Sequence, residues 1–88
     1  MISAVIPVFN EEESLDAFYK VLIANLPKLD KTYEIIFVDD GSTDKTLEIL
    51  KKFEAKNNNV RILSFRKNRG KAEVLTSGFK ASKGDLVV

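Results

Sequence analysis

The sequence has no cysteine, no long apolar run and no excess of charge of either sign. Without cysteine there is no disulfide framework, no thiolate zinc site and no catalytic thiol. No apolar run approaches ~20 residues, and no basic N-terminal segment precedes a long apolar stretch, so neither a spanning helix nor a signal peptide is predicted. Lysine and arginine number 14 against 13 aspartates and glutamates. This balance predicts no general attraction to nucleic acid or to an anionic membrane.

What the chain does have is an alternation of apolar runs and helical periods over 88 residues, the size of one small domain. Right-handed crossovers between such elements give an α/β fold, in which helices are layered on a parallel sheet. The sequence contains no internal repeat and no linker. Runs of branched and aromatic residues predict buried parallel strands at 2–9, 33–40 and 60–65, and the start of a fourth at 85–88. Apolar spacings of three and four predict helices around Leu15, Phe18, Leu22 and Leu26, around Leu47, Leu50 and Phe53, and around Leu75, Gly78 and Phe79.

Three segments follow the carboxyl ends of the predicted strands, and they are residues 7–14, 39–44 and 66–71. In open parallel sheets, ligands bind beyond these strand ends, where the chain leaves for the next helix. We therefore expect the functional residues in these three segments.

In the segment 7–14, Asn10 followed by Glu13 fits an N-cap and its reciprocal partner at a helix start. Capping therefore accounts for much of this segment without any ligand. Pro7 needs another explanation, because proline removes a donor from a strand ladder. We expect it to mark where strand pairing ends and a binding surface begins. Phe9 fits two interpretations, a core residue or a ring presented to a planar ligand.

In the segment 39–44, Gly41 permits a turn that other residues resist, and Ser42 or Thr43 can cap the next helix with Asp44 in its first turn. Neither Asp39 nor Asp40 is needed for such a turn. A carboxylate fixed at a strand end accepts hydrogen bonds from a ring N–H or a ribose hydroxyl, or helps to bind a cation. The alternative is a solvated pair of turn residues.

The segment 66–71 carries a cluster of cations around Gly70, formed by Arg66, Lys67, Arg69 and Lys71. A charge run of this kind is usually a solvated loop. Beside two acidic loops it also suits a ligand with donor groups at one end and phosphates at the other. It is no P-loop, because the first glycine of that pattern is absent and Ala72 replaces the magnesium-binding hydroxyl. No G-x-G-x-x-G fingerprint for dinucleotides occurs either.

The chain closely resembles the N-terminal half of family 2 glycosyltransferases in three segments, taken in order: AVIPVFNEEESL, YEIIFVDDGSTDKT and NRGKAEVLTSGFKASKGDLVV. Within that family it resembles most the enzymes that transfer mannose or glucose to a polyprenyl phosphate. The resemblance implies a three-layer, Rossmann-like half of the A-type glycosyltransferase fold, with sheet order 3-2-1-4 and helices on both faces. Residues 1–88 would form a single truncated domain that binds a nucleotide sugar.

The resemblance also assigns roles to individual residues. The second aspartate of the pair, Asp40, would accept a hydrogen bond from the base of a UDP- or GDP-sugar, and Asp39 would support the loop. Pro7, Phe9 and Glu11 would line the base and the ribose. Val38 would offer apolar or backbone contact, and Lys71 would lie near the base or the phosphates.

Other parts of such an enzyme are expected beyond Val88. In the family, a divalent metal (Mg or Mn) is bound through a D-x-D motif after the fourth strand, and the catalytic base and acceptor site follow. We therefore assign no catalytic residue and no metal ligand to this chain, and expect it to be inactive alone. The acceptor would be a polyprenyl phosphate or a glycan, and the enzyme cytoplasmic or associated with the cytoplasmic face of a membrane. An exposed sheet edge predicts self-association.

Two other classes of protein remain open. A receiver-like signalling domain also has a parallel sheet and an acidic pocket, but its acidic pair should follow the first strand, where this chain reads PVFN. A non-catalytic interaction fragment would fold only with its partner and would not respond to nucleotides.

Overall fold

The computed structural model describes residues 1–65, 80, 86 and 87. Its parallel sheet has the strand order β3-β2-β1-β4, in agreement with the predicted order 3-2-1-4. Strand β1 pairs with β2 from Ile2↔Tyr33 to Val8↔Asp39, whereas its described pairing with β4 comprises Ile2↔Leu86 and Ser3↔Val87. The described elements are β1 Ile2–Val8, α1 Leu15–Leu29, β2 Tyr33–Asp40, α2 Thr46–Lys56, β3 Val60–Phe65 and β4 Leu86–Val87.

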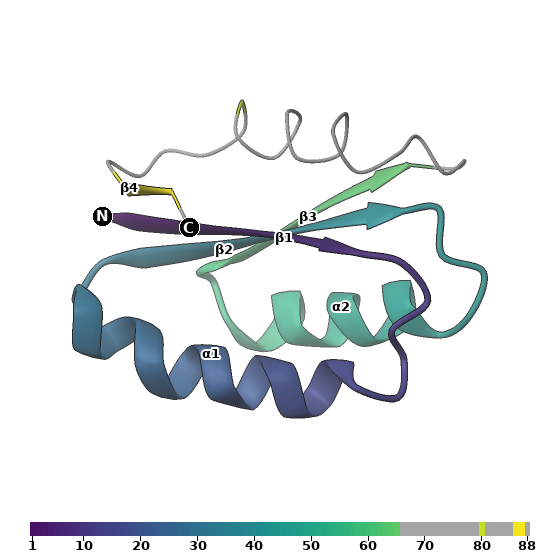
Figure 1. Cartoon of the computed structure of the whole chain (residues 1–88), viewed down its shortest axis with the longest axis horizontal. Helices are drawn as coiled ribbons and strands as arrows, with labels where there is room; N and C mark the ends of the chain where they lie inside the picture. Colours follow the sequence, from purple (N-terminus) through teal and green to yellow (C-terminus); the bar gives the residue numbers. More distant parts are fainter. Residues whose placement is uncertain (66–79, 81–85, 88) are drawn as a thin grey trace.

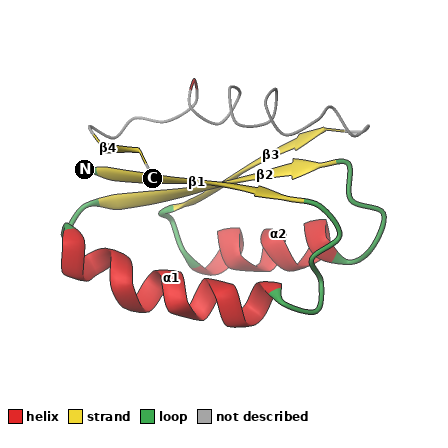
Figure 2. Ribbon diagram, in the orientation of Figure 1, coloured by secondary structure: helices red, strands yellow, loops and turns green. Residues whose placement is uncertain are grey.

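Helices α1 and α2 lie side by side along the same face of the sheet (Figures 1 and 2). Helices were predicted on both faces of the sheet. Among the described residues, α1 and α2 form a layer on one face. The third predicted helix, around Leu75, Gly78 and Phe79, falls outside the described residues, apart from the helical Lys80 that follows it.

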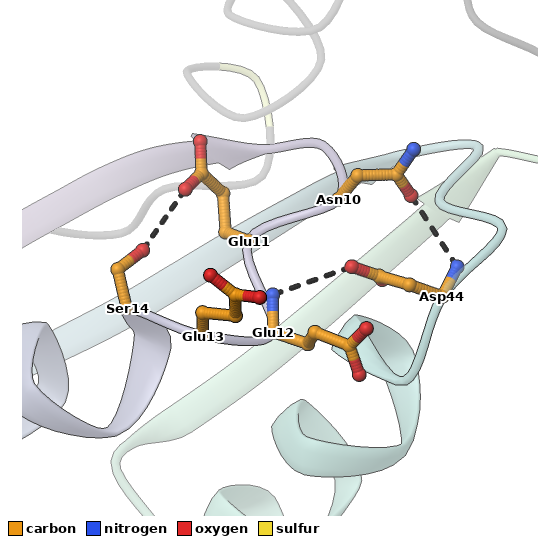
Figure 3. A pocket seen from close by; sticks show the side chains of 6 residues that line it. All are labelled: Asn10, Glu11, Glu12, Glu13, Ser14 and Asp44. Carbon is orange, nitrogen blue, oxygen red and sulfur yellow. Dashed lines mark hydrogen bonds between the residues drawn. The ribbon is translucent and has the colours of Figure 1, made fainter.

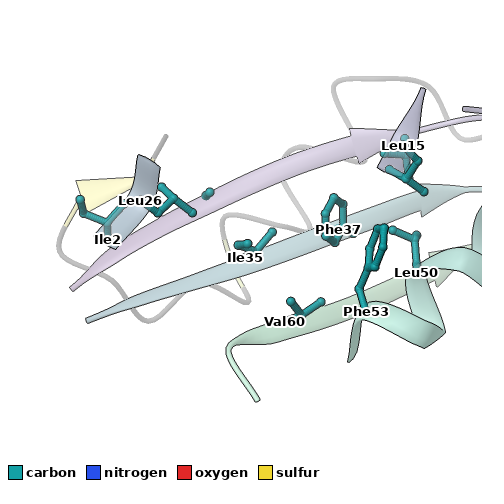
Figure 4. Packing of buried hydrophobic residues seen from close by; sticks show 10 residues of the cluster. Ile2, Leu15, Leu26, Ile35, Phe37, Leu50, Phe53 and Val60 are labelled. Carbon is teal, nitrogen blue, oxygen red and sulfur yellow. The ribbon is translucent and has the colours of Figure 1, made fainter. Parts of the chain in front are cut away.

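The main core fills the space between the sheet and the two helices (Figure 4). Phe37 of β2 is fully buried there, 6.2 Å from the ring of Phe53 between centroids. Tyr19 of α1 stacks on Phe53 of α2, with the ring centroids 3.9 Å apart, and so joins the two helices. The buried members of this cluster are Ile2, Ala4, Val8, Leu15, Leu26, Ile35, Phe37, Leu50, Phe53 and Val60.

The opposite face of the sheet carries a second apolar cluster. Val5, Ile36 and Val38 are buried there, and Leu63 and Phe65 pack against them. Because successive side chains of a strand point to opposite faces, β2 is buried on both sides. This confirms its interpretation as a parallel strand within a layered fold.

Three details of the predicted elements were wrong. Phe18 was expected on the buried stripe of α1 with Leu15 and Leu26, but it is 41% exposed and lines a hollow beside the first residues of that helix. Pro7 does not end the pairing with β2, since the ladder continues through Pro7↔Val38 and Val8↔Asp39. A proline is compatible with a ladder where its nitrogen faces away from the partner strand. Strand β1 ends at Val8, one residue before the predicted Phe9.

Candidate functional site

The candidate site lies where β1 and β2 end together, at the register position Val8↔Asp39. The first loop, residues 9–14, leads from β1 into α1, and the second loop, residues 41–45, leads from β2 into α2. Because the strands are parallel neighbours, both loops leave the same edge of the sheet. The sequence predicted this convergence.

Three consecutive backbone N–H groups of the first loop donate to side-chain oxygens that follow β2. Asn10 N–H donates to Ser42 Oγ at 2.9 Å, and Glu11 N–H donates to Thr46 Oγ1 at 2.8 Å. Glu12 N–H donates to Asp44 Oδ2 at 3.3 Å (Figure 3). The backbone of the first loop is thus held at Asn10, Glu11 and Glu12 by side chains of the second loop and of the first residue of α2.

The side chain of Asn10 reaches back in the opposite direction. Its Oδ1 accepts hydrogen bonds from the N–H of Thr43 at 2.8 Å and from the N–H of Asp44 at 3.3 Å, of which Figure 3 shows the second. Asn10 has a positive φ of 51°, a conformation that asparagine tolerates better than most residues. The predicted N-cap role of Asn10 is therefore wrong. The residue that precedes the helix is Ser14, whose Oγ donates to Glu11 Oε2 at 2.9 Å.

The second loop is closed by Asp39. Its Oδ1 accepts two hydrogen bonds from Ser42, one from the N–H at 3.3 Å and one from the hydroxyl group. Gly41, between the strand end and Ser42, has a positive φ of 81°. The interpretation that neither aspartate is needed for the turn was therefore wrong for Asp39, which supports the loop as the resemblance implied. Period-two alternation places Asp39 on the helix face of β2 and Asp40 on the other face.

The start of α2 also differs from the prediction. The helix begins at Thr46, with Lys45 at the cap position, so neither Ser42 nor Thr43 caps it and Asp44 precedes its first turn. Asp44 Oδ1 accepts from Thr46 N–H at 2.9 Å, which makes it the local capping side chain. Loss of hydration raises the pKa of the Asp44 carboxyl, but hydrogen bonds from Thr46 and from Glu12 lower it more, so the pKa lies below 3.8.

Two hollows adjoin the first loop. One, of about 380 Å³, is lined by Asn10, Ser14 and four carboxylates, those of Glu11, Glu12, Glu13 and Asp44 (Figure 3). The other, of about 300 Å³, is largely apolar. It is lined by Ile6, Pro7, Val8, Glu11, Ser14, Leu15 and Phe18. Pro7 and Glu11, two of the predicted site residues, therefore share one hollow.

The other predicted site residues occupy different positions. Phe9 is 43% exposed at the start of the first loop, and Asp40 is 7% exposed at the end of β2. The Val38 side chain is fully buried in the sheet, so of its two predicted contacts the backbone one is compatible with this structure. Lys71, like the rest of the segment 66–71, falls outside the described residues.

Sequence reasoning missed Ser42 and Thr46 as partners of the first loop. Ser42 was assigned to capping, and Thr46 was not considered. A threonine at the start of a helix, such as the buried Thr46, is only a weak indication of a contact with another loop. The hydroxyl-rich run STDKT does offer several hydrogen-bond acceptors after the second strand. Their partners are the backbone N–H groups of Asn10 and Glu11, which leave no trace in the sequence.

The described residues show no group of three or more histidine, cysteine, aspartate or glutamate side chains that could hold a metal ion. The carboxylates of the first loop line a surface but do not converge on one point. Within the same part of the chain, no helix is both long enough and apolar enough to cross a membrane.

Comparisons with known proteins agree with this geometry. S. aureus TarS 1-349 is 27% identical and superposes with a TM-score of 0.81, over 99% of this chain and 26% of TarS 1-349. The same fragment was also solved with UDP and with UDP-GlcNAc. A Pyrobaculum calidifontis mannosyltransferase in complex with GDP-Man and Mn²⁺ is 25% identical with a TM-score of 0.75, over 98% of this chain and 25% of that one.

The chain thus spans about a quarter of the length of these solved structures. No curated protein matches it closely enough to count as a relative. The family model for glycosyl transferase family 2 matches residues 3–88, which is nearly the whole chain. The chain therefore belongs to glycosyl transferase family 2.

Proposed function

We propose that this chain supplies the nucleoside-binding loops of a family 2 glycosyltransferase that uses a UDP- or GDP-sugar as donor. The observation that carries this proposal is the pair of hydrogen-bonded loops at the carboxyl edge of β1 and β2. This is the edge at which ligands bind in open parallel sheets. The structures of TarS with UDP and of the mannosyltransferase with GDP-Man support the same ligand class.

The residues at this edge match the chemistry of a nucleoside. The carboxylate of Asp40 is an acceptor for a base N–H, and the exposed ring of Phe9 offers a face on which a base can stack. Pro7 and Glu11 share the apolar hollow, where Glu11 can accept from a ribose hydroxyl. Val38 contributes backbone to the floor of the site.

The described part of the site is too acidic for the diphosphate. Glu11, Glu12, Glu13 and Asp44 line one hollow, and carboxylates repel phosphate oxygens. We therefore assign the phosphates to the cationic segment 66–71, including Lys71, which follows β3 in the sequence. The described residues serve the base and the ribose in this proposal.

The complete enzyme transfers a sugar with inversion to a polyprenyl phosphate or a glycan in this proposal. A carboxylate base activates the acceptor hydroxyl or phosphate, and a divalent metal stabilises the departing diphosphate. The described residues hold no group of side chains that fits such a metal, and in this proposal the metal ligands and the catalytic base lie outside the described residues. Residues 1–88 act as the donor-binding portion.

Titration of the ¹⁵N-labelled chain with UDP and with GDP tests this proposal. We expect weak binding, with a Kd of about 1 mM, because the described loops offer contacts to the nucleoside alone. Amide shifts should map to residues 7–11, 38–42 and 66–71. Inorganic pyrophosphate is the control, since it lacks a base and should leave residues 38–42 unchanged. Shifts confined to other regions, or no shifts at all, would show that the chain does not bind nucleotides.

A further inference from the structure

The first and second loops are joined by reciprocal hydrogen bonds. We call the four residues whose side chains accept backbone N–H bonds across this contact the loop clamp, and they are Asn10, Ser42, Asp44 and Thr46. The backbone of the first loop donates to Ser42, Thr46 and Asp44, whereas the backbone of the second loop donates to Asn10. Asn10 is therefore the member of the loop clamp that acts from the first loop on the second.

Asn10 lies between the two first-loop residues that our proposed function assigns to the nucleoside, Phe9 and Glu11. Its φ of 51° sets the direction in which the chain leaves β1. This conformation is held by the bonds of Oδ1 to the N–H groups of Thr43 and Asp44. If these bonds are lost, the residues on either side are no longer fixed before a ligand arrives.

We propose that Asn10 is a positioning residue for nucleoside binding. Its Oδ1 fixes the first loop to the second, so that the backbone of the first loop around Phe9 and Glu11 is already held beside the residues that follow β2. This inference rests on the proposed function and adds to it a residue that touches no ligand. Ordering a loop residue costs about 1 to 2 kcal/mol in backbone entropy, which corresponds to about a fivefold to thirtyfold loss of affinity when the ligand must order it.

The test compares three substitutions of Asn10 in the ¹⁵N-labelled chain. Asn10→Ala removes Oδ1 and disfavours the positive φ, whereas Asn10→Gly removes Oδ1 but adopts the positive φ without strain. Asn10→Asp keeps the acceptor and tolerates the same backbone conformation. Uridine and guanosine are the probes, because a neutral nucleoside is insensitive to the charge that the aspartate adds.

We expect Asn10→Ala and Asn10→Gly to weaken binding of the nucleoside that the wild type prefers by about fivefold or more. Asn10→Asp should stay within about twofold of the wild type and keep the amide shifts of Thr43 and Asp44, since its oxygen can accept the same two bonds. The matched control is Asn25→Ala. Asn25 is an exposed asparagine on α1 that donates to Val21 O at 2.7 Å, and its loss should leave affinity unchanged.

A second pair of variants keeps the test decisive if the alanine variant does not fold. Thr46→Val preserves the shape of a fully buried side chain but removes the acceptor of the Glu11 N–H, while Thr46→Ser keeps the hydroxyl group. We expect the valine variant to lose affinity, as the Asn10 variants do, and the serine variant to retain it. All affinities are measured at a temperature where thermal unfolding shows each variant to be folded.

The outcomes separate this inference from the proposed function. If the wild type binds nucleosides and the folded variants Asn10→Ala and Asn10→Gly bind them equally well, the positioning role is overturned and the proposed function stands. Wild-type affinity in Asn10→Gly but not in Asn10→Ala would also overturn the positioning role, since the backbone conformation would then suffice without Oδ1. If the wild type binds neither nucleosides nor nucleotides, both the inference and the proposed function fail.

Discussion

Ser3 and Glu34 face each other across the ladder between β1 and β2, and Ser3 Oγ donates a hydrogen bond of 2.7 Å to Glu34 Oε2. Glu34 Oε1 accepts from Arg61 of β3 at 3.0 Å. The three side chains therefore connect three neighbouring strands on the face of the sheet opposite α1 and α2. Ser3 and Glu34 are both buried, so the carboxylate depends on these donors in place of water.

Ser3→Ala should lower the free energy of unfolding by about 1 to 3 kcal/mol, because it removes a donor from a buried carboxylate. Urea denaturation followed by circular dichroism measures this change. Ser64→Ala is the matched control, since Ser64 is an exposed serine on β3 and its loss should cost less than about 0.5 kcal/mol. Equal stabilities of the two variants would show that the Ser3–Glu34 bond contributes nothing.

The core between the sheet and the helices should be sensitive to the loss of a single side chain. Leu50 is fully buried against the sheet, so Leu50→Ala should cost about 2 to 5 kcal/mol, by lost burial and the cavity left behind. Leu29→Ala makes the same chemical change at a side chain that is 70% exposed, and it should change stability by less than about 0.5 kcal/mol. Thermal unfolding of both variants checks the contrast, and comparable losses would contradict the packing described here.

The strands followed from the sequence because their signals are local, whereas the order of the sheet came from the resemblance to family 2 glycosyltransferases. YEIIFVDD is apolar on both faces, and this pattern predicts a buried parallel strand whatever its partners. Alternation alone also indicates that Asp39 and Asp40 point to opposite faces. The exposure of Phe18 was harder to predict, because helical spacing identifies an apolar stripe but not which of its members the rest of the chain covers.

The site was predictable in its location but not in its internal contacts. Parallel strand ends gave the location, since Val8 and Asp39 are register partners. The role of Asn10 depends instead on a contact with Thr43, which is 33 residues away. The pattern Asn-x-x-Glu matched a capping box, and no local pattern distinguishes a side chain that caps its own helix from one that binds a neighbouring loop.

Acid should open the loop clamp at Asp44. Folding lowers the pKa of this carboxyl from its ordinary value of 3.8. The ionised Asp44 therefore stabilises the loop contacts fully above the pKa of the unfolded chain, and this stabilisation is lost as the pH falls through the lower pKa of the folded chain. The amide signals of Glu12 and Thr46, which donate to Asp44, should shift with that midpoint in a pH titration by NMR.

Asp44→Asn is the control for this titration, because its side chain cannot be protonated in the same range and the two amide signals should then lose their shared midpoint. A midpoint at or above the ordinary value for aspartate would mean that the bonds to Asp44 are not formed in solution.

Substitutions of Asp40 and Asp39 should have different effects, the first on ligand binding and the second on stability. Asp40→Asn keeps the shape of the side chain but turns an acceptor-only group into a mixed one, so it should weaken UDP or GDP binding by about 1 to 3 kcal/mol with little change in melting temperature. Asp39→Ala removes the acceptor of Ser42 and should lower the melting temperature, because the second loop then loses its closing bonds. NMR titration and thermal unfolding of both variants measure the two effects. If Asp40→Asn leaves affinity unchanged while its melting temperature falls as in Asp39→Ala, then Asp40 is structural and makes no contact with the base.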